Sequence, residues 1–155
     1  MNLKYLLAII VTAFMLFSCD STSFVRGEHK VRAAVDSFAF YYFNWQFSKA
    51  SRFVTDSSQV WLRYAASQVH EADVKILRDK EDATIEIEEI NVTSGDEATA
   101  RITVRDFLRM DTIGTEGHLV KKASYILHLE EATEDKVRWK VRMEGLPQSE
   151  RRNRD

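Results

Sequence analysis

The stretch ATARITVRDFLRMD, residues 98–111, decides the fold, because apolar and polar side chains alternate along most of its length. Alternation with a period of two predicts a β-strand that buries one face and exposes the other. The face predicted to be buried carries Ala98, Ala100, Ile102, Val104, Leu108 and Met110. Asp106 falls on the same face, where it interrupts an otherwise apolar row.

Three more stretches alternate in the same way, and the turn-like segments TSGD, TIGTEG and ATEDK separate the four. These short connections predict an antiparallel meander with one buried face. In residues 84–92 the apolar phase slips after Ile87, which predicts a β-bulge near Glu88 and Glu89 that bends the sheet. The predicted inner faces of the last two stretches are formed by Leu119, Ala123, Tyr125, Leu127 and Leu129, and by Val137, Trp139, Val141 and Met143.

Helical periodicity precedes the strands. It predicts an α-helix from Glu28 whose apolar face consists of Val31, Val35, Phe38, Tyr42 and Trp45. Residues 38–47, FAFYYFNWQF, are aromatic almost all round, so this part of the helix is expected to be enclosed on several sides. Residues 48–80 predict one short and one longer helix, and residues 76–80 fit either helix or loop. The N-cap candidates of the longer helix are Asp56, Ser57 and Ser58.

Helices followed by a curved antiparallel sheet predict the α+β class, with N-terminal helices packed on four strands. The 155 residues suffice for one domain, and 45% apolar with 30% charged residues is typical of a folded chain. The net charge of -2 provides no basic field for nucleic acid, so we expect no nucleic-acid partner. A single cysteine excludes an intramolecular disulfide.

The N-terminal sequence MNLKYLLAIIVTAFMLFSC has one charge, an uninterrupted apolar run over residues 5–17, and a small residue before Cys19. This layout predicts a secretory signal peptide over residues 1–18, because the run is shorter than the ~20 residues of a spanning helix. Leu16-Phe17-Ser18-Cys19 resembles the lipobox of bacterial lipoproteins, in which the signal is cut before a cysteine that carries a lipid. The alternative is an ordinary cleaved signal peptide that leaves Cys19 as a free thiol.

The lipobox resemblance implies an anchor and a location. Cys19 would carry a diacylglycerol with acyl chains of the palmitate type, and residues 19–27 would form a short polar tether. The protein would then be held at the cell membrane or outer membrane of a Gram-negative bacterium. It would face the periplasm or the cell surface.

The order of elements, the helix-to-helix turn FSKASRFVT (47–55) and the final strand VRWKVRMEGLP (137–147) resemble one protein class. This class is the small bacterial lipoproteins of unknown function in the nuclear transport factor 2-like superfamily, whose domain is a cystatin-like cone. The resemblance covers residues 28–147 and implies a cone-shaped domain there, with 148–155 as a polar tail. The superfamily contains isomerases, dehydratases, ligand binders and scaffolds, so the fold does not decide among these functions.

Two functions fit these observations. In the first, the protein is a non-catalytic module whose aromatic helix and sheet bind an envelope protein or form a homodimer. In the second, a pocket in the cone holds a small apolar ligand. The candidate pocket residues are Phe38, Tyr42, Trp45, Trp61, Asp106, Tyr125 and Trp139. The same aromatic residues also fit a packed core without a cavity.

Asp106 suggests a third, more remote function. If its carboxylate faced the cone, it would be buried, and Lys121 on the neighbouring stretch would be a possible cationic partner. Enzymes of the superfamily that move protons use acidic groups and a tyrosine, so the resemblance implies Tyr41 or Tyr42 beside Asp106. The alternative is a local bulge that turns Asp106 outward and Phe107 inward. We favour the bulge, because bulges are common in bent sheets.

No sequence pattern indicates a metal or a cofactor. His70-Glu71 begins like a zinc-protease motif, but Val74 occupies the position of the second histidine. The outer face of the sheet carries cationic side chains that could meet anionic lipid headgroups, namely Arg101, Arg105, Lys122, Arg138, Lys140 and Arg142. Acidic residues on the same face, Glu86, Glu88 and Glu130, instead favour an ordinary exposed sheet with cross-strand ion pairs.

Overall fold

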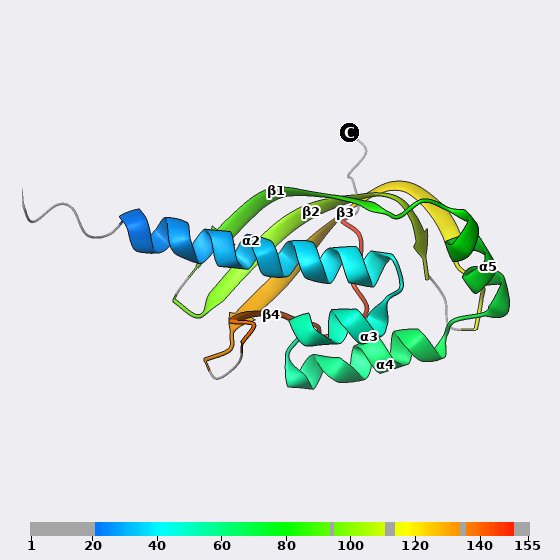
Figure 1. Ribbon diagram of the computed structural model, residues 1–155, viewed down its shortest axis with the longest axis horizontal. Helices are drawn as coiled ribbons and strands as arrows, with labels where there is room; N and C mark the ends of the chain where they lie inside the picture. Colours follow the sequence, from blue (N-terminus) through cyan, green and yellow to red (C-terminus); the bar gives the residue numbers. More distant parts are fainter. Residues whose placement is uncertain (1–20, 94, 111–113, 134–135, 151–155) are drawn as a thin grey trace, which may run out of the picture.

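The computed structural model describes residues 21–93, 95–110, 114–133 and 136–150 (Figure 1). It confirms the α+β class, because N-terminal helices pack on a curved antiparallel sheet with the order β1-β2-β3-β4. The helical elements are α2 (Ser21–Phe43), α3 (Phe47–Ala50), η1 (Ser51–Phe53), η2 (Asp56–Ser58), α4 (Gln59–Ser67) and α5 (Glu71–Asp79). The strands are β1 (Thr84–Val92), β2 (Glu97–Arg109), β3 (His118–Glu131) and β4 (Trp139–Arg142).

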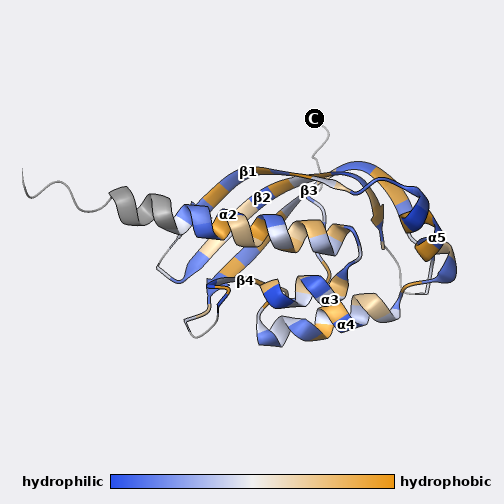
Figure 2. Cartoon of the chain, in the orientation of Figure 1, coloured by the Kyte–Doolittle hydropathy of each residue, from blue (hydrophilic) through white to orange (hydrophobic). Residues whose placement is uncertain are grey.

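The long helix α2 lies under the arch of the sheet and contacts β1, β2 and β4. Val31, Val35 and Phe38, which were predicted to form its apolar face, are completely buried. Figure 2 shows apolar residues along the part of α2 that crosses the sheet, with hydrophilic residues just before it. The helix is already formed at Ser21, the first described residue, so residues 21–27 of the predicted tether are helical.

A tight turn ends α2 and places a tryptophan in the left-handed region, with φ of 56° at Trp45. The Trp45 N–H donates to the Tyr42 carbonyl (3.0 Å). The Gln46 N–H donates to the Tyr41 carbonyl (2.8 Å), which completes a Schellman motif. Glycine usually holds this position, because a large side chain is strained there. The Trp45 indole N–H donates to the Leu108 carbonyl on β2 (3.0 Å), and this bond offsets the strain. Trp45 therefore lies beyond the helix and not on its predicted apolar face.

Asn44 joins this turn to the start of the sheet. Its Oδ1 accepts a hydrogen bond from the Ala83 N–H (2.7 Å), and its Nδ2 donates to the Phe40 carbonyl (2.9 Å). We expect Asn44→Ala to lower the free energy of unfolding by about 1–3 kcal/mol, because the buried Ala83 N–H loses its acceptor. Urea unfolding measures the change. Asn91→Ala removes an exposed amide on β1 and should cost less than about 0.5 kcal/mol, so equal losses would contradict the role of Asn44.

Three short helical parts connect α2 to β1, instead of the one short and one longer helix predicted. They are α3 with η1, η2 with α4, and α5. α5 ends at Asp79, so the segment that fitted either helix or loop is mostly helical. Ser58 directly precedes α4 but does not cap it. Its Oγ accepts a hydrogen bond from the Met143 N–H (2.8 Å), which fixes the start of α4 to the chain just after β4.

The sheet is the predicted meander, in which each strand pairs with the next one along the chain. The register of β1 against β2 shifts between Ile87 and Glu89, which confirms the predicted bulge. The inner face of the sheet is buried against α2, and η1 and η2 contact β4. Its buried residues include Ala98, Ala100, Ile102, Val104, Tyr125, Leu127, Leu129, Trp139 and Val141.

β2 reverses its faces at Asp106. This residue has φ of 51° and is exposed, whereas the next residue, Phe107, is completely buried. The predicted outward Asp106 and inward Phe107 are therefore confirmed. The register is nevertheless the same on both sides, with Arg105 opposite Lys122 and Phe107 opposite Val120. No extra residue is inserted, so the irregularity is not the bulge that the alternation suggested.

β3 reverses its faces at the same level, which explains the unchanged register. Leu119 is 61% exposed, although strict alternation predicted it to be buried. Val120 packs against the core instead, opposite Phe107. Lys121, across from Asp106, is exposed as well. β2 and β3 thus exchange their buried and exposed faces at the same level of the sheet. As a result, both Asp106 and Lys121 are exposed.

The segment after β4 returns along β3. Ser149 forms an isolated bridge with Tyr125, and the Glu150 N–H donates to the Ser124 carbonyl (2.8 Å). The Glu150 carboxylate also forms an ion pair with Arg101 on β2 (3.0 Å). The predicted polar tail, 148–155, therefore belongs to the sheet as far as Glu150.

Candidate functional site

A small cavity lies inside the cone, among the residues that the structure describes. Its volume is about 30 Å³, which is enough for roughly one water molecule. Three of the predicted pocket residues line it, namely Tyr42, Trp45 and Tyr125. An apolar ligand larger than a few atoms does not fit there unless the surrounding side chains move.

Aromatic rings fill the rest of this interior. The ring of Phe43 lies 4.8 Å from that of Tyr125 and 5.3 Å from that of Phe107, measured between centroids. Phe38 stacks on Tyr42 with centroids 5.4 Å apart. Such tilted and stacked pairs are the usual packing of aromatic side chains in a core. The aromatic run of α2 thus forms core rather than the wall of a pocket.

Tyr42 has an altered ionisation equilibrium in this environment. Burial raises the pKa of its phenol, and the neighbouring Tyr125 raises it further. Because desolvation disfavours the phenolate, Tyr42 stays protonated and neutral at neutral pH. It can donate a hydrogen bond but does not act as a base.

Asp106, the predicted acidic partner of Tyr42, lies outside the cavity. Its positive φ turns the side chain to the exposed side of β2, and Lys121 on β3 is also exposed. The carboxylate therefore does not reach the interior, and the arrangement needed for proton transfer is not assembled. Asp106 was predicted as a pocket residue, but it lies on the exposed side of β2.

The remaining predicted pocket residues lie at three separate places. Phe38 is completely buried in the core. Trp61 on α4 is half-buried and contacts the edge of Tyr64, with centroids 6.4 Å apart. Trp139 on β4 is buried but lines a different hollow. The predicted set thus does not form one site.

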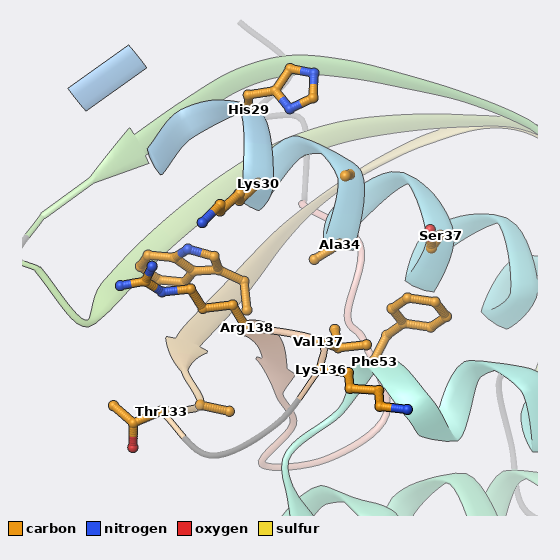
Figure 3. A pocket seen from close by; sticks show the side chains of 12 residues that line it. His29, Lys30, Ala34, Ser37, Phe53, Thr133, Lys136, Val137 and Arg138 are labelled. Carbon is orange, nitrogen blue, oxygen red and sulfur yellow. The ribbon is translucent and has the colours of Figure 1, made fainter. Parts of the chain in front are cut away.

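A much larger groove lies on the outside of the cone, between α2, η1 and the connection from β3 to β4 (Figure 3). Its volume is about 590 Å³, within the range of about 300–1,000 Å³ that is typical of ligand pockets. The described residues that line this groove are His29, Lys30, Ala33, Ala34, Ser37, Phe53, Ala132, Thr133, Lys136, Val137, Arg138 and Trp139. We call it the α2–β4 groove.

The α2–β4 groove has a basic rim and an apolar floor. Among the described residues that line it, the ionisable ones are His29, Lys30, Lys136 and Arg138, and Arg138 is paired with Glu131. Figure 3 shows the Lys30 side chain directed from α2 toward the β4 side, where Arg138 lies. Of the lining residues, the sequence predicted Trp139 as a pocket residue and Arg138 as a cationic residue of the outer sheet face. The others were missed, because nothing in the sequence brings the start of α2 next to the last strand.

The outer face of the sheet is a network of ion pairs. Its arginines pair with glutamates as Arg101–Glu89, Arg101–Glu150, Arg105–Glu86, Arg138–Glu131, Arg142–Glu130 and Arg142–Glu144. Glu130 raises the pKa of the Arg142 guanidinium through a hydrogen bond and through its charge. The cationic residues of this face are largely neutralised by neighbours, as the cross-strand interpretation predicted.

Asp73 is the most deeply buried carboxylate among the described residues, at 1% exposure. It accepts hydrogen bonds from the backbone N–H groups of His70 (2.9 Å) and Gly117 (2.8 Å). These bonds fix the start of α5 to the chain before β3, which is a structural role. Within residues 21–150 as far as they are described, no three His, Cys, Asp or Glu side chains are placed to hold a metal ion.

A helix that crosses a bilayer needs about 20 predominantly apolar residues. Of the helices in the described part of the chain, none is both long and apolar enough to cross a bilayer. Cys19 and the predicted signal peptide, 1–18, lie outside the described residues.

Comparisons with known proteins show a similarity to a solved structure. No family model and no curated protein matches the chain. The chain is similar to the crystal structure of a ketosteroid isomerase-like protein from Erwinia carotovora atroseptica SCRI1043. The match covers 72% of this chain and 88% of that one, at 16% sequence identity and a TM-score of 0.46. Neither a family nor an activity follows for this chain from a similarity at this level.

Proposed function

We propose that this protein is a membrane-anchored, non-catalytic binding module of the bacterial cell envelope. One observation carries the proposal. The cavity that the described residues enclose inside the cone, about 30 Å³, is too small for a substrate, whereas a groove of about 590 Å³ is open on the outside. Recognition at an outer groove suits a module that holds another molecule, because catalysis usually needs a site that excludes water.

The anchor in this proposal is a lipid on Cys19, and its support is the sequence of residues 1–19. Cys19 precedes the first described residue of α2, Ser21, by two positions. A connection this short would hold the domain close to the bilayer, with the beginning of α2 nearest the lipid. The groove lies along the following turns of α2, so its ligand would be met near the membrane surface.

The two alternative functions have less support. An apolar ligand inside the cone would have to displace packed aromatic rings, since the free space is about 30 Å³. A proton-transfer enzyme would need a carboxylate beside Tyr42, and Asp106 points the other way. A partner protein or a homodimer remains compatible with the proposed module.

Mass spectrometry of the full-length protein, purified from bacterial membranes in a neutral detergent, tests this proposal. Under denaturing conditions we expect a chain that begins at Cys19 and carries the mass of a lipid. A chain without a lipid would overturn the proposed anchor. Under native conditions, an apolar adduct retained equally by the wild type and by the groove variant Lys30→Glu would place a ligand in the cone and would contradict the proposed module.

A further inference from the structure

The first strand, β1, forms an open edge of the sheet. The strand order is β1-β2-β3-β4, so β1 pairs with β2 on one side only (Figure 1). Among the described residues, no backbone hydrogen bond reaches the other side of β1. The N–H and C=O groups on that side can therefore pair with another strand. The bulge after Ile87 interrupts the regular backbone, so residues 84–87 are the part of the edge that suits pairing.

A hollow between α2 and β1 lies beside this part of the edge. We call it the α2–β1 hollow. Its volume is about 370 Å³, within the range of about 300–1,000 Å³ that is typical of ligand pockets. The residues that line it are all described, and they are His29, Arg32, Ala33, Asp36, Ile85 and Ile87. Ile85 and Ile87 pack against the core but stay partly exposed. Arg32 is already paired with Glu28 (3.5 Å). The hollow thus offers apolar surface beside an open strand.

The chain that forms this edge is acidic. Residues 81–92, EDATIEIEEINV, contain five acidic residues and no basic one, and all of them are described. The Glu86 side chain is 60% exposed and lies 3.5 Å from Arg105 of β2. Asp36 and Asp82 are exposed, and neither forms a hydrogen bond or an ion pair with the described residues. These carboxylates can therefore accept charge-assisted hydrogen bonds from a cationic partner.

We propose that residues 84–87 bind an extended segment of a partner protein that alternates apolar and basic residues. The segment adds a strand to the edge by backbone pairing, and pockets for alternate side chains provide specificity in such complexes. Side chains of a strand point alternately to the two faces of the sheet. Those on the inner face would enter the α2–β1 hollow over Ile85 and Ile87, and those on the outer face would meet Glu86.

This inference goes beyond the proposed function, because it concerns the β1 flank of α2 and not the α2–β4 groove. It holds whether or not Cys19 carries a lipid. The acidic edge is what selects the partner. Glutamates on an exposed edge strand discourage pairing between like copies, whereas a strand with basic residues gains from the same charges.

Two other occupants fit the edge less well. Antiparallel pairing of two β1 strands from two copies would bring glutamates beside glutamates, which destabilises the pair. The C-terminal sequence RRNRD, 151–155, is basic but lies outside the described residues. It follows Glu150, whose N–H donates to Ser124 on β3 (2.8 Å), two strands away from the open side of β1.

Fluorescence anisotropy of the full-length protein in a neutral detergent tests the proposal, with protein-free detergent as the blank. The probe is a labelled and capped hexapeptide of alternating lysine and valine. We expect it to bind more tightly than a glutamate–valine hexapeptide, which has the wrong charge. It should also bind more tightly than the same lysine–valine peptide with all amides N-methylated, because this peptide has no backbone donors for pairing. Equal binding of either control peptide, or no binding of the probe, would overturn the proposal.

Charge variants locate the site. Glu86→Lys is expected to weaken binding of the probe by about tenfold, because it replaces an attractive contact with a repulsive one. Glu144→Lys makes the same charge change at a side chain that is 84% exposed, just after β4 at the opposite edge of the sheet. It should leave binding unchanged. Equal losses for the two variants would indicate a general charge effect and would overturn the assignment to β1.

Two further outcomes identify the other occupants. In native mass spectrometry, a dimer that the probe dissociates would assign the edge to a second copy of the chain. Binding of the probe that appears only after residues 151–155 are removed would assign it to the chain's own C-terminal segment. Either result would overturn a partner protein as the occupant. A monomer that binds the probe with residues 151–155 present is the result that we expect.

Discussion

Cys19→Ala is expected to abolish incorporation of an alkyne analogue of palmitate into the full-length protein produced in a Gram-negative bacterium. The chain contains a single cysteine, so no second thiol can accept the lipid when it is removed. Acyl chains contribute ~0.8 kcal/mol of membrane affinity per buried methylene, and two or more chains are needed for stable anchoring. Labelling is a better readout than fractionation, because the apolar run at residues 5–17 could hold an unprocessed chain in the membrane.

Ser23→Ala is the matched control for this experiment. It removes a hydroxyl four positions after Cys19 and should leave labelling unchanged. Labelling that persists in Cys19→Ala would show that the lipid is attached elsewhere, or that the lipobox resemblance is misleading. In either case the anchor proposed here would be wrong, and the ordinary cleaved signal peptide would become the better interpretation.

The sheet could be predicted from the sequence because its periodicity is local. Each strand shows its own alternation, and the phase slip after Ile87 marks the bulge without any knowledge of the partner strand. The buried face of α2 followed in the same way from the spacing of its apolar residues. These features depend on neighbours a few residues away, which a single sequence displays directly.

The reversal at Asp106 was predictable only in part. The sequence indicated that a charged residue would leave the apolar row, and the structure confirms it. Lys121 interrupts the apolar row of β3 in the same way, between Leu119 and Ala123. The sequence did not indicate, however, that the two interruptions lie opposite each other. Only the pairing of the two strands couples the reversals and leaves their register unchanged. Leu119 was therefore assigned to the wrong face.

The candidate site depends on contacts between distant parts of the chain, and this is why it was missed. Aromatic residues suggested a pocket inside the cone, but packing density decides whether aromatics enclose a cavity, and no sequence pattern reports it. Lys30 and Trp139 line one groove from opposite ends of the domain. Trp45 was likewise placed on the helix, since its left-handed backbone is unusual for a tryptophan.

Phe107→Ala is expected to lower the free energy of unfolding by about 3–5 kcal/mol, the usual cost of removing a buried phenylalanine ring. Phe107 is completely buried, and its ring contacts those of Phe43 (5.3 Å) and Tyr125 (6.1 Å between centroids). The substitution leaves a cavity where the two reversed strands meet the end of α2. Urea unfolding, followed by tryptophan fluorescence, measures the loss.

Leu119→Ala, compared with Phe107→Ala, tests whether β2 and β3 exchange their buried and exposed faces at Asp106 and Lys121. Strict alternation places Leu119 in the core and Phe107 outside it, whereas the reversal exposes 61% of Leu119. With the reversal, Leu119→Ala should change the free energy of unfolding by less than about 0.5 kcal/mol. The opposite order, a large loss at Leu119 and a small one at Phe107, would mean that β2 and β3 alternate without interruption. Asp106 would then face the interior beside Tyr42, and the proton-transfer function would regain the geometry that it lacks here.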